Sequence, residues 1–209
     1  MPNTTNYSFP TPADSDLVKN GADAIRDLGD AVDTAMNTAL GTKKAGMVLL
    51  NTTSFSGVAS QAITPVFSAT YQNYKIILTF TANSLSANTR IRLRAGATNA
   101  AGNNYARAGY YNYSSGSAGN LAQSGVASID IGNQSSAAAG RNVYLFDFAN
   151  PFLAKETTVN MGWAVQDTAG FIWASISFLH DLATSYDGFD IIADSGTISG
   201  KVSVYGYNL

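Results

Sequence analysis

The sequence predicts a mainly β protein: an antiparallel β-sandwich, jelly-roll-like, preceded by an extended arm and a short helical, coiled-coil-like stem. Three observations support this prediction. From residue 46 onward, apolar and polar residues alternate over short segments, as they do in half-buried strands. Clusters of Gly, Asn, Ser and Asp separate these segments, with no helical pattern between them. A heptad pattern is confined to residues 16–40, so we divide the chain into residues 1–44, the arm and helix, and residues 45–209, the sandwich.

About ten strands are expected at this spacing, and the absence of a repeat of fixed period argues against a propeller or a β-helix. The alternating segments are rich in β-branched and aromatic residues, which favour strands. The clearest segments are residues 74–80, 89–95, 127–131, 142–148, 158–166, 172–178, 189–193 and 200–207.

The composition predicts a surface covered mainly by uncharged polar groups. Apolar residues make up 45% of the chain and charged residues only 12%, about half of the usual fraction. A net charge of −2 provides no field that would attract nucleic acid. The chain has no cysteine and one histidine, so we expect no disulfide, no metal and no cofactor. The longest mostly apolar run, residues 170–179, is too short to span a bilayer, and the first residues do not resemble a signal peptide; we expect no membrane insertion.

The helical segment carries an uninterrupted apolar seam. With Val18 at heptad position a, positions a and d are all apolar or small, and positions e and g carry no charge. Parallel two-stranded coiled coils usually have charged e and g positions, so the wider face favours a homotrimer or a groove in another protein. The alternative is a helix that folds back on its own sandwich. The predicted oligomerisation residues are Val18, Ile25, Leu28, Val32 and Ala35.

The segment before the helix is an arm of residues 1–12, in which Tyr7 and Phe9 are the large apolar side chains. Thr11 is the expected N-cap and Pro12 the expected first helical residue, a position at which proline is favoured. The helix would therefore start at the end of the arm and stop near Gly41.

The segment "NYSFPTPADSDLVKNGADAIRDLGDAVDTAM", residues 6–36, resembles the N-terminal segment of many tailed-bacteriophage virion proteins, among them minor tail proteins, tail fibres and head fibres. Those proteins more often have Trp at the position of Phe9 and an acidic residue at that of Ala13. The resemblance implies a shared docking and stem element, with Tyr7, Phe9 and Pro10 anchoring the chain to another virion protein. It implies a location on the particle surface. The matching residues are Asn6, Tyr7, Phe9, Pro10, Thr11, Pro12, Asp16, Leu17, Val18, Gly21, Ala22, Ile25, Arg26, Leu28, Gly29, Val32, Asp33 and Thr34.

The later stretches "VFSATYQNYKIIL", "IRLRAG" and "ISGKVSVYGY" resemble a β-sandwich body that recurs in phage structural proteins. This second resemblance implies a fold and assigns no role to any residue.

Residues typical of catalysis are sparse. No GxSxG motif accompanies His180, which we expect at the surface at the end of a strand. Most body carboxylates lie in turn-like contexts, and Asp147 is the one that interrupts an apolar strand. We therefore expect no enzyme.

Two groups of side chains are candidate contacts to host glycans or anions. Arg90, Arg92 and Arg94 share one face of a strand, which suits an anionic polymer or, alternatively, an exposed face with ion pairs. Tyrosines followed by a Gly/Ser-rich loop suit a sugar ring or, equally, a subunit interface. The candidates in this second group are Tyr110, Tyr111 and Tyr113.

Together these patterns predict a virion fibre or spike, a homotrimer that is anchored by its N-terminus and contacts host surface polysaccharide during adsorption. The alternative is a capsid decoration (cement) or head-fibre protein without a host ligand. Location on head or tail, the host receptor and the docking partner are left open.

Overall fold

The computed structural model describes residues 4, 5, 7–11, 17, 20–41, 46–134, 142–167 and 170–208. The chain forms two compact units. The first consists of Met1–Gly46 with Asn208, and the second of Met47–Tyr207 with Leu209. The division lies next to the predicted boundary between residues 44 and 45.

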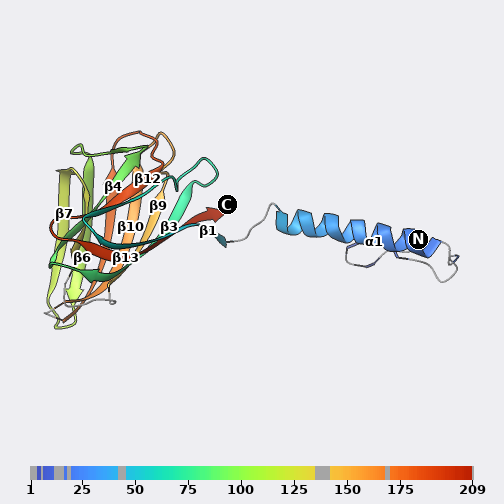
Figure 1. Ribbon diagram of the computed structural model, residues 1–209, viewed down its shortest axis with the longest axis horizontal. Coiled ribbons are helices and arrows are strands. Elements are labelled where there is room, and N and C mark those ends of the chain that lie inside the picture. The colour runs from blue at the N-terminus through green and yellow to red at the C-terminus, as the bar shows by residue number, and fades with distance from the viewer. Residues whose placement is uncertain are drawn as a thin grey trace. The chain divides into compact units, whose positions relative to one another are not determined.

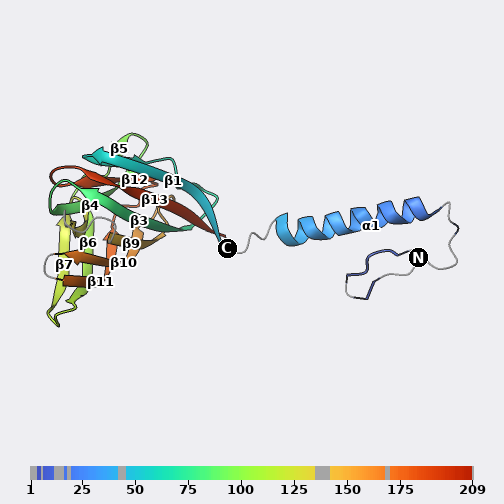
Figure 2. The same ribbon diagram turned by 60° about the horizontal axis from the view of Figure 1, so that its bottom comes forward.

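The larger unit is built from two antiparallel sheets (Figures 1 and 2). The first sheet has eight strands and carries most of the cross-strand pairing. In spatial order its strands are β1 (Gly46–Val58), β13 (Ile198–Asn208), β3 (Asn73–Asn83), β9 (Asn142–Ala149), β10 (Thr157–Asp167), β11 (Gly170–His180), β6 (Tyr105–Tyr113) and β7 (Ala118–Val126).

The second sheet has five strands and covers one face of the first. Four of them follow one path, and the fifth lies off this path, because it pairs with a strand that already has two neighbours. The strands in spatial order are β2 (Ser60–Ile63), β12 (Gly188–Ala193), β4 (Ala87–Ala95) and β5 (Thr98–Asn99), and β8 (Ile129–Gln134) also pairs with β4.

A single aromatic-rich core fills the space between the sheets. Along β9, residues 142, 144, 146 and 148 are buried while their neighbours face outward, as expected for a period of two. Phe148 on β9 packs against Phe189 on β12, with ring centroids 6.0 Å apart, so the contact joins the two sheets. Phe67 lies 5.7 Å from Phe148 and 5.9 Å from Phe189, which completes the cluster. These side chains are almost fully buried.

The structure confirms the mainly β class and a sandwich-like pair of antiparallel sheets. Seven of the eight clearest predicted segments lie within strands, and of the eighth, residues 127–131, only residues 129–131 do, because β8 begins at Ile129. Five strands were not predicted as strands, and three of them lack clear alternation: β1 is rich in Thr and Ser, β5 has two residues, and β7 contains Gly119 and Gly125. The jelly-roll connectivity stays a prediction.

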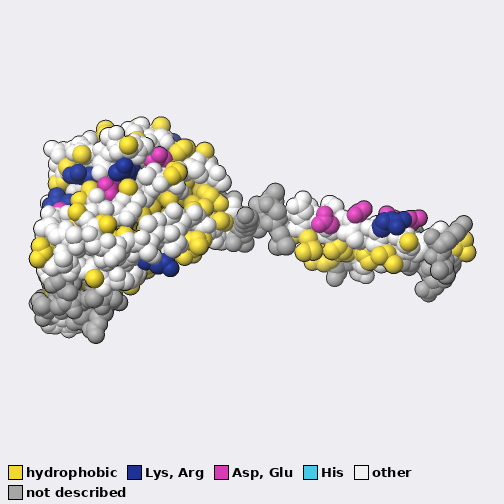
Figure 3. Space-filling model, viewed as in Figure 1, with side chains coloured by type: hydrophobic (Ala, Val, Ile, Leu, Met, Phe, Trp, Pro, Cys, Tyr) yellow, Lys and Arg dark blue, Asp and Glu magenta, His cyan; other side chains and the backbone are white. Residues whose placement is uncertain are grey.

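The smaller unit contains helix α1 (Gly21–Met36), which continues as a π-helical segment, η2 (Asn37–Gly41). The predicted start near Thr11 is wrong, because Thr11 and Leu17 are not helical and the helix begins after Asn20. Pro12 and Val18 lie outside the described residues. Charged side chains line one side of α1 and hydrophobic ones the other (Figure 3). None of the described helices is long and apolar enough to span a bilayer.

His180 is buried, and the predicted surface position is therefore wrong. It ends β11 as expected, but only 2% of the residue is exposed. Its ring packs edge-on against Tyr105 and Tyr186, with centroids 4.4 and 5.2 Å away. Burial lowers the pKa of His180 below its ordinary value of 6.5, although the neighbouring Asp181 partly opposes this shift.

Acidification should destabilise the sandwich through His180. The buried imidazole takes up its proton at a lower pH than the histidine of the unfolded chain, which does so near pH 6.5. Stability is then full above that pH and falls as the pH drops below it, by at most about 1.4 kcal/mol per pH unit from this group. Urea unfolding between pH 8 and pH 5 measures the slope, and the single histidine resonance reports its pKa by NMR. An equally steep slope in His180→Phe would show that another group is responsible.

Candidate functional site

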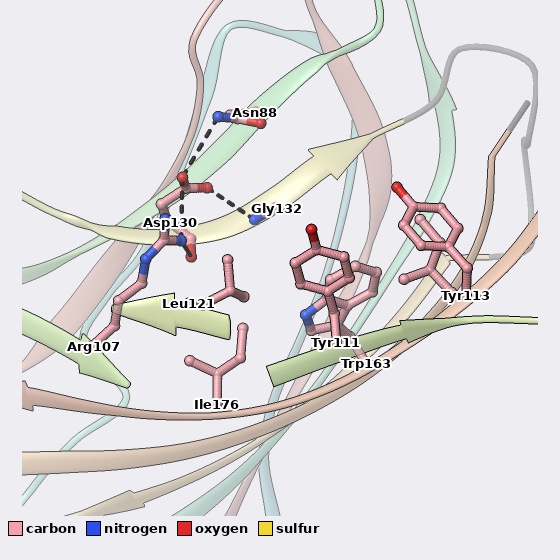
Figure 4. Close-up of a pocket in the computed structure, with 10 residues that line it drawn as sticks. Asn88, Arg107, Tyr111, Tyr113, Leu121, Asp130, Gly132, Trp163 and Ile176 are labelled. Atoms are coloured by element: carbon pink, nitrogen blue, oxygen red, sulfur yellow. Dashed lines mark hydrogen bonds and ion pairs between the residues drawn. The ribbon is translucent and has the colours of Figure 1, made fainter. Parts of the chain in front are cut away.

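The candidate site is a partly enclosed cavity of about 250 Å³ at the β6–β7 side of the sandwich (Figure 4). It is lined by strands of both sheets. An apolar cavity of about 150 Å³ holds one benzene-sized ring, so this space suits a single six-membered ring with substituents. The lining residues are Asn88, Arg107, Tyr111, Tyr113, Leu121, Asp130, Gly132, Trp163, Ile172 and Ile176.

One wall of the cavity is aromatic. Trp163 on β10, Ala174 on β11 and Tyr111 on β6 are register partners in one row across the large sheet. Ala174 is small and lies between two large rings, so the side chains of this row do not fill the space between the sheets. Tyr111 continues the wall to Tyr113, 5.8 Å away and edge-on. A Cβ at Gly119, the partner of Tyr111 on β7, would lie 2.5 Å from the Tyr111 ring, so glycine gives this ring its place.

The opposite wall is polar. Asp130 on β8 forms an ion pair with Arg107 on β6, with 3.2 Å between Oδ2 and Nη1. Nη1 of Arg107 also donates to the carbonyl of Asp130 at 3.0 Å. The other carboxylate oxygen accepts the backbone N–H of Gly132 at 2.9 Å, and the amide of Asn88 lies 3.5 Å from Oδ2. The wall is thus rigidly bonded and has no net charge.

Two buried donors of this cavity make no hydrogen bond with any described residue: the indole Nε1–H of Trp163 and the Nε–H of Arg107. Trp163 is only 9% exposed. Its indole nitrogen points toward the side of the cavity where Leu121 and Ile176 lie (Figure 4). Buried polar groups normally have a partner. Other buried side-chain atoms without one, such as those of Thr89 and Thr157, do not line this cavity.

The three candidate tyrosines are divided between the two faces of the sheet. Tyr111 and Tyr113 line the cavity, whereas Tyr110 faces outward and packs against Trp173, with ring centroids 5.3 Å apart. Both outward rings are more than two-fifths exposed. Together with three other exposed side chains of β9 and β11 they form an outer apolar patch: Tyr110, Val143, Leu145, Phe171 and Trp173.

The candidate arginines lie on one face of β4 as predicted, and each is bonded within its own chain. Arg90 forms an ion pair with Asp194, with 2.5 Å between Nε and Oδ1. Arg92 donates to the carbonyl of Ala127. Arg94 contacts Asp190 at 3.3 Å, and this pair is largely buried. An anionic ligand would have to compete with these contacts, which favours the ion-paired alternative for this strand.

In the smaller unit, the arm residues predicted to anchor the chain lie beside residues predicted to associate. The rings of Tyr7 and Phe9 stack with centroids 5.6 Å apart. Both rings line a groove of about 320 Å³ together with Val32, Ala35, Met36 and Ala39. Ile25 is 68% exposed, while Leu28 and Pro10 are half-buried.

The sequence drew attention to metal-ligating residues and to one carboxylate in an apolar strand. No group of three or more His, Asp or Glu side chains among the described residues could hold a metal ion. Asp147, the carboxylate that interrupts an apolar strand, faces outward and bonds Lys75 at 2.8 Å. The hydroxyl of Tyr207 also donates to it, and burial together with this carboxylate raises the pKa of Tyr207 to about 12.

Sequence patterns did not single out Trp163, Arg107, Asn88 or Asp130. The sequence contained one indication of the position of Arg107. It is an even number of residues away from Tyr105 and Tyr111, so all three side chains lie on the inward face of β6. No family model, curated protein or solved structure matches this chain.

Replacing Asp190 should destabilise the sandwich strongly. Asp190→Ala leaves the guanidinium of Arg94 and the amide of Asn99 without a shared acceptor in a largely buried place. We expect a loss of about 3–5 kcal/mol in the free energy of unfolding, measured by urea titration. Asp194→Ala is the matched control, because its pair with Arg90 is more exposed and should contribute about 0–1 kcal/mol. Equal losses in the two variants would contradict this prediction.

Proposed function

We infer that this chain is a structural protein of a tailed-bacteriophage particle, a homotrimeric fibre in which the N-terminal unit joins and mounts the subunits and the sandwich contacts host surface glycans. The observation that carries the proposal is the exposed apolar side of α1. Ile25 is 68% exposed and Met36 54% exposed, although both belong to the continuous apolar face of the helix.

The contrast with the sandwich supports this proposal. The sandwich has an extensive buried core, in which residues such as Ile76, Leu78 and Val202 have no exposed surface, in addition to the side chains of the outer apolar patch. In α1, Ala24 is the one residue that is fully buried. A helix of this length with Gly29 inside it is marginal by itself in water. Further copies of α1 would cover the face, as a coiled-coil-like stem.

The resemblance of residues 6–36 to virion proteins supports the mounting role. Tyr7, at 74% exposure, offers a large apolar ring to a partner, and Phe9 stacks on it. Such a pair of rings on an irregular arm suits a shallow socket on another virion protein.

The contact with glycans is supported by the surface chemistry of the sandwich. Aromatic rings near amides and hydroxyls are suited to a sugar, whose apolar face stacks while its hydroxyls form hydrogen bonds. The sandwich presents such groups in the cavity and, by Tyr110 and Trp173, on its outer face.

One observation favours the second candidate, a capsid decoration or head-fibre protein without a host ligand. The outer apolar patch is exposed, and a Cβ at Gly162, between Leu145 and Ser175 in the sheet, would meet no atom within 4 Å. Surfaces of this kind also suit contact with a protein. Labelling of the particle separates the candidates: copies spread over the capsid favour decoration, and a few copies at the tail favour adsorption.

Charge on the apolar face of α1 should separate the subunits. We expect the full chain to sediment as a trimer and Ile25→Asp to sediment largely as a monomer, because three carboxylates would meet in the seam. Analytical ultracentrifugation over a range of concentrations measures this. A chain that is monomeric at all concentrations would overturn the trimeric stem.

The matched control is Thr34→Asp, which adds the same charge at an exposed position on the other side of the helix. It should remain a trimer.

Incorporation into particles tests the mounting role. Replacing Tyr7 and Phe9 by Ala should remove the chain from virions without altering the sandwich, and normal incorporation would argue against the mounting role.

A further inference from the structure

We propose that the cavity lined by Trp163, Tyr111, Arg107 and Asp130 is a binding site for one neutral sugar ring, a hexose or N-acetylhexosamine unit of a host glycan. This assignment rests on the proposed contact with glycans and names the site and the class of sugar. The site is distinct from the arginine row and from the outer apolar patch.

The first step of the argument is the pair of unpartnered donors. Nε1–H of Trp163 and Nε–H of Arg107 are buried, lack a partner among the described residues and belong to residues of the same cavity. An indole N–H can only donate, so the group that completes the site must bring an acceptor. Sugar hydroxyls, a ring oxygen and an acetamido carbonyl all meet this requirement.

The second step is the division of the walls. Figure 4 shows Asp130, Arg107 and Asn88 on one side and Tyr111, Tyr113 and Trp163 on the other. A pyranose ring has the same division, with apolar C–H groups on its faces and hydroxyls on its rim. An entirely apolar ligand would leave the polar wall without partners, at a cost in free energy.

The third step is charge. The carboxylate of Asp130 lies 3.2 Å from Nη1 of Arg107 and neutralises it, and Arg107 is the one cation among the described residues that line the cavity. The same carboxylate accepts the N–H of Gly132 and still has capacity to accept from a hydroxyl. An acidic sugar would bring its carboxylate close to Asp130, and none of the described lining residues is an unpaired cation that would offset the repulsion. Neutral sugars are therefore favoured.

The fourth step is size and order. The volume of about 250 Å³ admits one ring and excludes a longer chain from the interior, so a glycan would enter by a terminal residue. The walls are held in place before any ligand arrives. A Cβ at Gly132 would lie 3.4 Å from the Trp163 ring, and Trp163 stacks on Tyr144 at 6.0 Å.

The two tryptophans of the chain provide the test, because Trp163 lines the cavity and Trp173 lies in the outer apolar patch. Each gives one indole N–H signal in a ¹⁵N-labelled full-length chain. The titrants are glucose, galactose, mannose, N-acetylglucosamine and N-acetylgalactosamine, with galacturonic and N-acetylneuraminic acids as acidic sugars and glycerol as a polyol without a ring. We expect saturable movement of the Trp163 signal with at least one neutral sugar, an unchanged Trp173 signal, and a dissociation constant on the order of 1 mM.

Paired variants then examine the donor itself. Trp163→Phe keeps an aromatic ring but removes the N–H, and should weaken binding about five- to tenfold in saturation-transfer NMR. Trp173→Phe makes the same chemical change outside the cavity and should leave affinity unchanged. If Trp163→Phe does not fold, Asn88→Ala serves instead: its amide makes one long contact, 3.5 Å from Asp130, so the fold should tolerate its loss while affinity falls.

Three results would overturn the assignment. With no movement of the Trp163 signal up to about 100 mM of every sugar, the cavity holds water only. Movement with the acidic sugars alone would refute the neutral class. Movement of the Trp173 signal alone would place the sugar on the outer patch, and the proposed glycan contact would then stand while the cavity site fell. None of these results alters the sedimentation and incorporation tests, which decide the fibre proposal separately.

Discussion

The arrangement of the sandwich depends on the register of its long antiparallel pairs. In a strand, successive side chains point to opposite faces, so a slip of one residue would exchange the core face and the solvent face. The aromatic contacts between Phe148 and Phe189, 6.0 Å apart across the two sheets, require that β9 and β12 both present the correct face. With this register set, the faces of all neighbouring strands follow. The cavity and the outer apolar patch are both consequences, since Tyr111 and Tyr110 are consecutive residues of β6 on opposite faces.

The same constraint explains the polar wall of the cavity. Arg107 has the parity of the inward side chains of β6, so its guanidinium is directed into a region from which water is partly excluded. An unpaired cation there would be costly, and Asp130 on the facing sheet supplies the compensating charge and a carbonyl. The pair connects the edge regions of the two sheets where the aromatic core ends. It also fixes the guanidinium of Arg107 and the carboxylate of Asp130 beside the cavity, and a ligand site needs such order before its ligand arrives.

Sequence patterns predicted most strands and the presence of a helix, because alternation and heptad spacing follow directly from which side chains are buried. They failed where burial has another cause. His180 was placed at the surface because it is polar and ends a strand, yet it is enclosed by Tyr105, which is distant in the chain, and by Tyr186, which follows it in the next loop. The helix start at Thr11 was inferred from a favourable cap and proline, but the described backbone becomes helical only at Gly21. The cavity could not be predicted, since it requires Ala174 between two large rings on neighbouring strands, and cross-strand neighbours are not visible in one sequence.

The two units differ in how far the burial of their apolar side chains depends on contacts with other molecules. The sandwich satisfies its own core, whereas the helical unit leaves Ile25 and Met36 exposed and covers part of the same face with its own arm. Under the proposed function, the arm that mounts the chain and the neighbouring copies of α1 compete for the same apolar face of the helix. Tyr7 and Phe9 line the groove formed with Val32 and Met36, so an arm that leaves to enter a socket uncovers apolar area on α1. Neighbouring copies would then gain more by covering that area than they would while each arm lies beside it. Docking on the particle would in this way strengthen the stem at the place where the fibre is needed.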